Sequence, residues 1–171
     1  MISILPETKE FYAAIHEINV LAFGRESEAR LVENIRKSSD FIPELSLVAA
    51  KEGRVVGHIL FSRITIQTEN GILPALALAP MAVHPKFQNK GIGSSLVWQG
   101  LKDCRNQGYE IVVVIGHPNY YPRFVFTSAR ANGPETNFSV ADEAFMVIEL
   151  TSGALNMIGG MVIYPPVFDE V

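Results

Sequence analysis

The chain has 171 residues, of which 48% are hydrophobic and 19% are charged, and this balance excludes an intrinsically disordered protein. The formal net charge of −4 argues against broad nucleic-acid binding, because such binding depends on many Lys and Arg contacts to phosphates. Cys104 is the only cysteine, so no disulfide framework can form within one chain.

Apolar residues in the first half recur with the periods of a strand, two helices and three further strands. The predicted helices, separated by Gly24, are residues 7–22 and 26–37. The predicted strands are residues 2–5, 45–50, 54–65 and 72–83. Turn residues at 51–54 and 68–71 join the last three strands as hairpins. Because Pro74 and Pro80 interrupt the last of these strands, we expect it to be irregular or bulged.

The second half is predicted to contain one long helix, a buried strand, a short helix and two more strands. In that order they are residues 91–107, 111–115, 120–124, 145–150 and 161–164. Gly108 is the expected C-cap of the long helix. The final strand pairs either within the domain or across a homodimer. The whole order of elements indicates an α/β or α+β domain, residues 1–171, around a mixed sheet.

A pair of glycines marks the junction between the strand ending at residue 83 and the long helix. The stretch reads Gln88-Asn89-Lys90-Gly91-Ile92-Gly93. Without a Cβ, the backbone can approach a ligand closely, and the free N–H groups of the first helical turn favour an anion. The stretch is therefore either a cradle for a phosphorylated ligand or an ordinary turn. It does not match the dinucleotide fingerprint, whose third glycine would fall on Leu96. It does not match the P-loop either, because that motif has Lys directly after its last glycine, whereas Ser94-Ser95 follows Gly93.

Two motifs, together with this order of predicted strands and helices, resemble the GNAT superfamily of acyl-coenzyme A dependent N-acetyltransferases. The first is Gln-x-x-Gly-x-Gly after a strand that ends Met81-Ala82-Val83-His84-Pro85. The second, Tyr120-Tyr121-Pro122-Arg123-Phe124-Val125-Phe126, is similar to the family's Tyr-x-x-x-Gly-Phe. The segment 116–124 also resembles a bacterial branch of small N-acetyltransferases. The resemblance covers nearly the whole chain. It implies a mostly antiparallel central sheet with a splayed parallel pair, flanked by about four helices.

The resemblance also implies acetyl-coenzyme A as co-substrate, without a metal. The residues expected to bind it are Met81, Ala82, Val83, Gln88, Asn89, Lys90, Gly91, Ile92, Gly93 and Ser94. Backbone N–H groups of the glycine stretch would bind the pyrophosphate, and the Met81 N–H would polarise the thioester carbonyl. Lys86 and Lys90 either bind outer phosphates or belong to a solvated loop. Val125 replaces the family's glycine, and because valine disfavours a positive φ we expect the turn there to differ.

The family's reaction is attack of a neutral amine on the thioester. Tyr121 occupies the family's general-acid position, and the alternative is a tyrosine that only packs at the edge of the core. Many members carry a glutamate before the cradle, but residues 76–80 contain no acid. His117 is the candidate base, in competition with a route through water. Glu26 and Glu28 lie where the family's acceptor site often is, or else are surface charges.

Two classes of function remain open at this level. One is an N-acetyltransferase with a small-molecule or peptide amine as acceptor, and the other is a non-catalytic sensor or regulatory module that binds acyl-coenzyme A. Both need the cradle, but only the enzyme needs Tyr121 and a route for the amine's proton. We expect no nucleic-acid or membrane partner. We expect a cytoplasmic location, since residues 1–7 lack the pattern of a signal peptide and no apolar run has membrane-spanning length.

Overall fold

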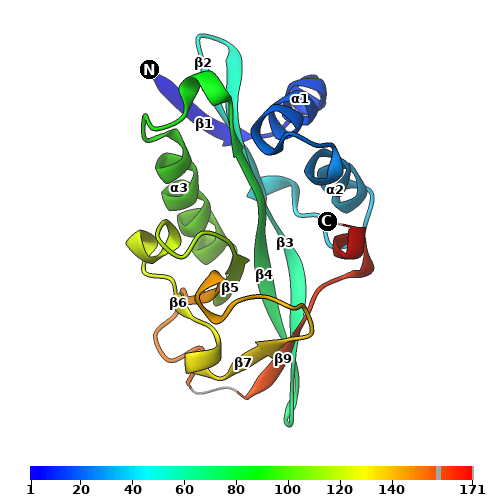
Figure 1. The fold of residues 1–171 in the computed structure, drawn as a ribbon, viewed down its shortest axis with the longest axis vertical. Helices are drawn as coiled ribbons and strands as arrows, with labels where there is room; N and C mark the ends of the chain where they lie inside the picture. The colour runs from blue at the N-terminus through cyan, green and yellow to red at the C-terminus, as the bar shows by residue number, and fades with distance from the viewer. Residues whose placement is uncertain (157–158, 171) are drawn as a thin grey trace.

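The computed structural model describes residues 1–156 and 159–170, which form a mixed sheet with helices on both faces (Figure 1). The strands are β1 (Ile2–Pro6), β2 (Ser46–Lys51), β3 (Arg54–Thr68), β4 (Gly71–Val83), β5 (Ile111–Ile115), β6 (Thr127–Ser128), β7 (Pro134–Thr136), β8 (Phe145–Glu149) and β9 (Gly160–Ile163). The α-helices are α1 (Tyr12–Phe23), α2 (Ser27–Arg36) and α3 (Ile92–Asn106). Short 3₁₀ helices are η1 (Lys9–Phe11), η2 (Pro43–Leu45), η3 (Pro85–Phe87), η4 (Tyr121–Phe124), η5 (Arg130–Asn132), η6 (Asp142–Ala144) and η7 (Pro166–Glu170).

The sheet follows the order β1, β2, β3, β4, β5, β8 and β6. Its pairings are antiparallel except β4 with β5 and the short pairing of β7 with β9. The predicted α/β (α+β) fold is thus confirmed. The expected fourth helix is only the 3₁₀ turn η4. Strands β6 and β7 are not among the predicted elements, and β9 pairs within the chain on both of its edges, with β3 and with β7.

Strand β4 is bulged at Pro80, as predicted, but Pro74 pairs in regular register with Thr65. Ile59 of β3 faces Met81 and Phe61 faces Leu78, so two residues of β4, Ala79 and Pro80, lie opposite the single residue between them on β3. A bulge of this kind bends its strand and breaks the regular ladder. It lies just before the glycine stretch and therefore shapes the end of β4 that approaches the candidate site.

The parallel pair of β4 and β5 is splayed. The two strands pair only at Leu76 with Val112 and at Ala77 with Val113. Beyond these two positions β4 continues to Val83 and keeps its pairing with β3 alone. The strands therefore part at the carboxyl end of β5 and leave an opening in the middle of the sheet.

Helices cover the two faces of the sheet unequally (Figure 1). Helix α3 packs on one face, in a core with Leu76 and Leu78 of β4. Helices α1 and α2 pack on the other face, where β4 presents Ala75 and Ala77. No helix in the described ranges is long and apolar enough to cross a membrane.

Candidate active site

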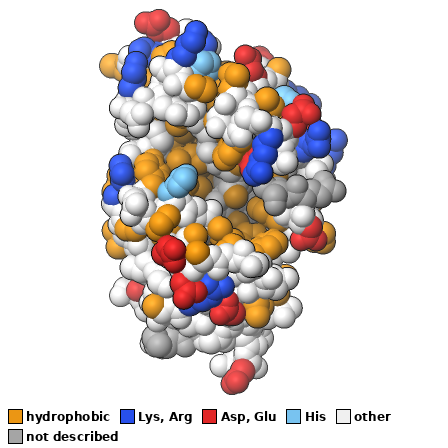
Figure 2. Space-filling model, viewed as in Figure 1, with side chains coloured by type: hydrophobic (Ala, Val, Ile, Leu, Met, Phe, Trp, Pro, Cys, Tyr) orange, Lys and Arg blue, Asp and Glu red, His pale blue; other side chains and the backbone are white. Residues whose placement is uncertain are grey.

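A cleft of about 930 Å³ lies at the opening between β4 and β5. Figure 2 shows the hollow near the middle of the face turned toward the viewer, surrounded largely by hydrophobic side chains. Its lining comes from α1, α2, the end of β4, the glycine stretch, the start of α3 and the segment that follows β5. Of the sequence-predicted residues it brings together Met81, Ala82, Val83, Gln88, Asn89, Gly91, Ile92, Gly93, Ser94, His117 and Tyr121. Lys90 and Lys86 are not among the residues that line it.

The glycine stretch forms a tight loop into α3. Asn89 and Gly91 have φ of 62° and 84°, in the left-handed region that glycine adopts without strain. The Gln88 side-chain amide donates to the Val83 carbonyl at 3.0 Å, which ties the loop back to β4. No side chain caps the N-terminus of α3. The first N–H groups of the helix thus lack an intrahelical partner and are available to an anion in the cleft.

Gly93 is a position where any larger residue would collide. A Cβ there would lie 2.8 Å from the Tyr120 hydroxyl oxygen and 3.6 Å from the end of the Met81 side chain. Tyr120 is half-buried, and the Arg123 guanidinium lies 4.6 Å from its ring centre. Tyr120 therefore forms part of the wall of the cleft, next to the cradle.

Tyr121 also lines the cleft, beside Tyr120, and is tightly packed on all other sides. It is 7% exposed, and its ring lies so close to Gly116 that a Cβ on that glycine would be 2.5 Å away. The rings of Tyr120 and Phe126 pack edge-on against it, at 5.1 Å and 5.7 Å between centres. Burial, and then the neighbouring Tyr120, raise the pKa of the Tyr121 phenol above its usual value. The phenol is therefore protonated at neutral pH and able to donate a proton.

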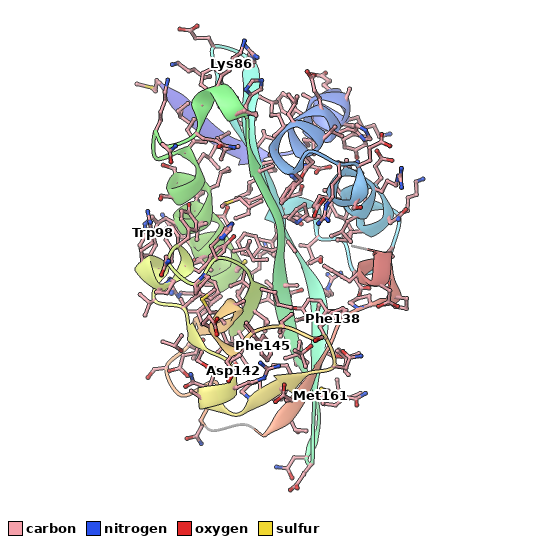
Figure 3. The ribbon with its side chains drawn as sticks, viewed as in Figure 1. Lys86, Trp98, Phe138, Asp142, Phe145 and Met161 are labelled. Atoms are coloured by element: carbon pink, nitrogen blue, oxygen red, sulfur yellow. The ribbon has the colours of Figure 1, made fainter. Side chains whose placement is uncertain are left out.

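The turn after Tyr121 corrects one expectation. We expected Val125 to change this turn, yet its φ is 74° and its ψ is 12°, the left-handed conformation that suits glycine. The turn keeps its shape because neighbouring contacts hold it. The Val125 N–H donates to the Pro122 carbonyl at 3.0 Å, and Phe124 is fully buried edge-on to Trp98 of α3, whose place Figure 3 shows. The valine therefore carries local strain, and the placement of Tyr121 is unaffected.

His117 and the two glutamates have different surroundings. His117 is exposed at the cleft, and its carbonyl accepts the N–H groups of Tyr120 and Tyr121 at 3.1 Å and 3.4 Å. Glu26 is exposed and binds Arg30 at 2.9 Å, as a surface charge does. For Glu28 the surface reading is wrong, because the residue is 5% exposed and lines the cleft.

The sequence carries a signal for the burial of Glu28. On α2 it lies three, four and seven residues before the buried Leu31, Val32 and Ile35, which places it on the apolar face. Arg25 donates to its carboxylate at 2.9 Å and 2.5 Å. Within the described ranges, no three His, Cys, Asp or Glu side chains come together as a metal ion would require.

Comparison with known proteins agrees with this geometry. The model of the acetyltransferase (GNAT) family matches residues 9–123. Two Escherichia coli K12 proteins, the uncharacterized N-acetyltransferases YjhQ and YhbS, are 36% and 35% identical to the chain. The YjhQ match covers 85% of this chain and 82% of the relative, and the YhbS match covers 87% of each.

Two solved structures share the fold over nearly the full length. The crystal structure of E. coli YhbS in complex with CoA has a TM-score of 0.90 and 30% identity, and covers 98% of this chain and 92% of that one. A Brucella melitensis GNAT family acetyltransferase in complex with acetyl-CoA has a TM-score of 0.81 and 28% identity, and covers 99% of both chains. The chain therefore belongs to the GNAT family of acetyltransferases.

Proposed function

We propose that the protein transfers the acetyl group of acetyl-CoA to a primary amine of a small molecule or peptide by direct attack. The observation that carries this proposal is one continuous cleft. It joins the uncapped N-terminus of α3 to the opening between β4 and β5, with Tyr121 in its wall. The CoA and acetyl-CoA complexes of the two structural relatives support the choice of cofactor.

The cradle and the open edge of β4 divide the binding of the cofactor between them. Backbone N–H groups from Gln88 to Ser94 bind the pyrophosphate, and Gly91 and Gly93 allow its close approach. In residues 81–83, alternate backbone groups face the open edge of β4, because β3 occupies only the other edge. These groups pair with the pantetheine arm, and the Met81 N–H donates to the thioester oxygen as negative charge develops on it.

The reaction needs one proton donor and one route for proton removal. The amine lone pair attacks the thioester carbon, and an oxyanion forms. When it collapses, the carbon–sulfur bond breaks and the CoA thiolate takes the phenolic proton of Tyr121. The phenol of Tyr121 is protonated at neutral pH and so can supply this proton. The amine loses its own proton to His117, which is exposed at the cleft, or to water.

The test of Tyr121 compares two neighbouring tyrosines. Tyr121→Phe keeps the packed ring and removes the proton, so turnover should fall by roughly 10²–10⁴-fold. Tyr120→Phe is the matched control and should keep most of its turnover. The measurement is release of free thiol from acetyl-CoA across a panel of primary amines, with acetyl-CoA affinity checked by calorimetry. Wild-type turnover in Tyr121→Phe would remove it as the acid. Tight acetyl-CoA binding without thiol release from any amine would indicate a non-catalytic acyl-CoA-binding module instead.

The route for the amine's proton is tested by pH dependence. If His117 is the base, kcat/KM should show an acidic limb that disappears, with much of the rate, in His117→Ala. If water takes the proton, kcat/KM should rise with pH in step with the pKa of the amine. This rise should be the same in the wild type and in His117→Ala. Identical profiles would thus leave His117 as a loop residue and assign the proton to solvent.

A further inference from the structure

The cleft is lined from both faces of the sheet. Met81 and Val83 of β4 pack with the core of the α3 face, and Ala79 and Ala82 pack with the core under α1 and α2. The cradle belongs to the α3 face, yet the cleft also reaches side chains of α1 and α2. It therefore runs through the opening between β4 and β5. A cofactor whose phosphates lie at α3 presents its far end toward α1 and α2.

The wall that α1 and α2 contribute is apolar with one exception. It consists of Ala22, Phe23, Leu31 and Glu28. Glu28 is the one acidic side chain that lines the cleft among the residues the structure describes. A carboxylate so deeply buried among apolar groups is costly unless a cation or hydrogen-bond donors compensate it.

In this structure Arg25, which does not line the cleft, compensates the negative charge of the Glu28 carboxylate. Its side chain is 57% exposed and gives the carboxylate two hydrogen bonds. A carboxylate has about four lone-pair sites, so two remain for a second donor. Because the Arg25 guanidinium is exposed, it can also swing into water at little cost when a ligand brings its own positive charge.

We propose that Glu28 binds the ammonium group of the acceptor, so that the acceptor is a cationic amine with a hydrocarbon body that rests on Phe23 and Leu31. This inference rests on the proposed acetyl transfer, since it assigns that site its acceptor. It gives Glu28 the role of holding the amine beside the end of the cofactor, while proton removal stays with His117 or water. Glu26, one half-turn away and paired with Arg30 in solvent, takes no part.

The test uses ligands that differ only in charge. Protein saturated with CoA, which has no acetyl group to transfer, is titrated by calorimetry with n-butylamine, protonated at pH 7, and with neutral 1-butanol. The wild type should prefer n-butylammonium, and Glu28→Gln should lose about tenfold or more of that affinity while its 1-butanol and CoA affinities stay the same. Glu26→Gln is the matched control and should bind as the wild type does. No preference for the cation in the wild type, or equal affinity in Glu28→Gln, would overturn the proposal.

A second variant separates binding from folding. Arg25→Gln keeps the carboxylate and removes its present partner, so it should bind n-butylammonium as tightly as the wild type or more tightly. A loss as large as that of Glu28→Gln would show that the pair only supports the fold, and would overturn the proposal. In thiol release with 2-phenylethylamine, Glu28→Gln should raise the KM of the amine about tenfold and leave the KM of acetyl-CoA unchanged. If the wild type turns over no amine, acetyl transfer fails as the function, but the titrations still decide whether Glu28 binds cations.

Discussion

A buried carboxylate outside the cleft should make the protein sensitive to acid. The Glu7 side chain is 2% exposed and accepts hydrogen bonds from Arg36 at 2.8 Å and 3.2 Å and from the Ser46 hydroxyl. His58, fully buried, lies 3.7 Å from the same carboxylate. Burial alone would raise the pKa of Glu7, but the nearby His58 and the hydrogen bonds from Arg36 and Ser46 outweigh it and lower the pKa from 4.5 to about 2.

The size and the sign of the effect follow from this difference. A pKa that falls from 4.5 to about 2 on folding corresponds to about 3.5 kcal/mol of stability, at about 1.4 kcal/mol for each pKa unit. Since the folded pKa is the lower one, this stability is present above pH 4.5 and is lost as the pH falls toward 2. Burial also lowers the pKa of His58 below 6.5, so the unfolded chain gains a proton there first and stability begins to decline below that pH.

Urea unfolding of the wild type and Glu7→Gln from pH 7 to pH 2.5 tests the reasoning. The variant should be less stable by about 3.5 kcal/mol at pH 7, and the two curves should converge toward pH 2.5. Glu10→Gln changes an exposed glutamate in the neighbouring turn and should follow the wild type throughout. A constant gap between the wild type and Glu7→Gln over the whole range would mean that the variant loses packing and not a charge interaction, and the argument would fail.

Three further substitutions probe the glycine positions and the strained turn. Gly93→Asp places a side chain against Tyr120 and a negative charge at the N-terminus of α3. Calorimetry should therefore show a large loss of acetyl-CoA affinity, while the circular dichroism spectrum stays unchanged. Equal affinity in the variant and the wild type would mean that the cofactor binds elsewhere. Val125→Gly relieves a left-handed residue that is 66% exposed, and should raise stability by about 1 kcal/mol in thermal unfolding. A lower melting temperature would show that the valine is not strained. Gly100→Ala brings a Cβ within 2.3 Å of the Phe61 ring and should cost about 1–3 kcal/mol in the same assay, whereas an unchanged protein would mean that the core there adapts freely.

The sequence predicts best those features that local chemistry determines. The turn at 51–54 is an example, because Glu52 and Gly53 both take a positive φ, as a two-residue hairpin between strands requires. The bulge of β4 follows from Pro80, and the uncapped start of α3 follows from the glycine pair. In each case a few neighbouring residues leave the backbone little choice.

The missed features depend on partners far along the chain. Strands β6 and β7 have two and three residues, too few to show a period, and they form only because β8 and β9 lie beside them. Val125 adopts the conformation of a glycine because surrounding contacts override its own preference. The charge of Glu28 suits the surface, but its position in the apolar register of α2 decides that it is buried.

The position of Glu28 also bears on the acid that β4 lacks. On the face toward α1 and α2, β4 presents Ala75, Ala77, Ala79 and Ala82, of which Ala79 and Ala82 also line the cleft. The acidic side chain that lines the cleft comes from α2 instead, where Glu28 lies on the face of the sheet opposite the cradle. The absence of an acid from 76–80 is therefore compatible with a negative charge at the acceptor end of the cleft, supplied by a helix in place of the strand.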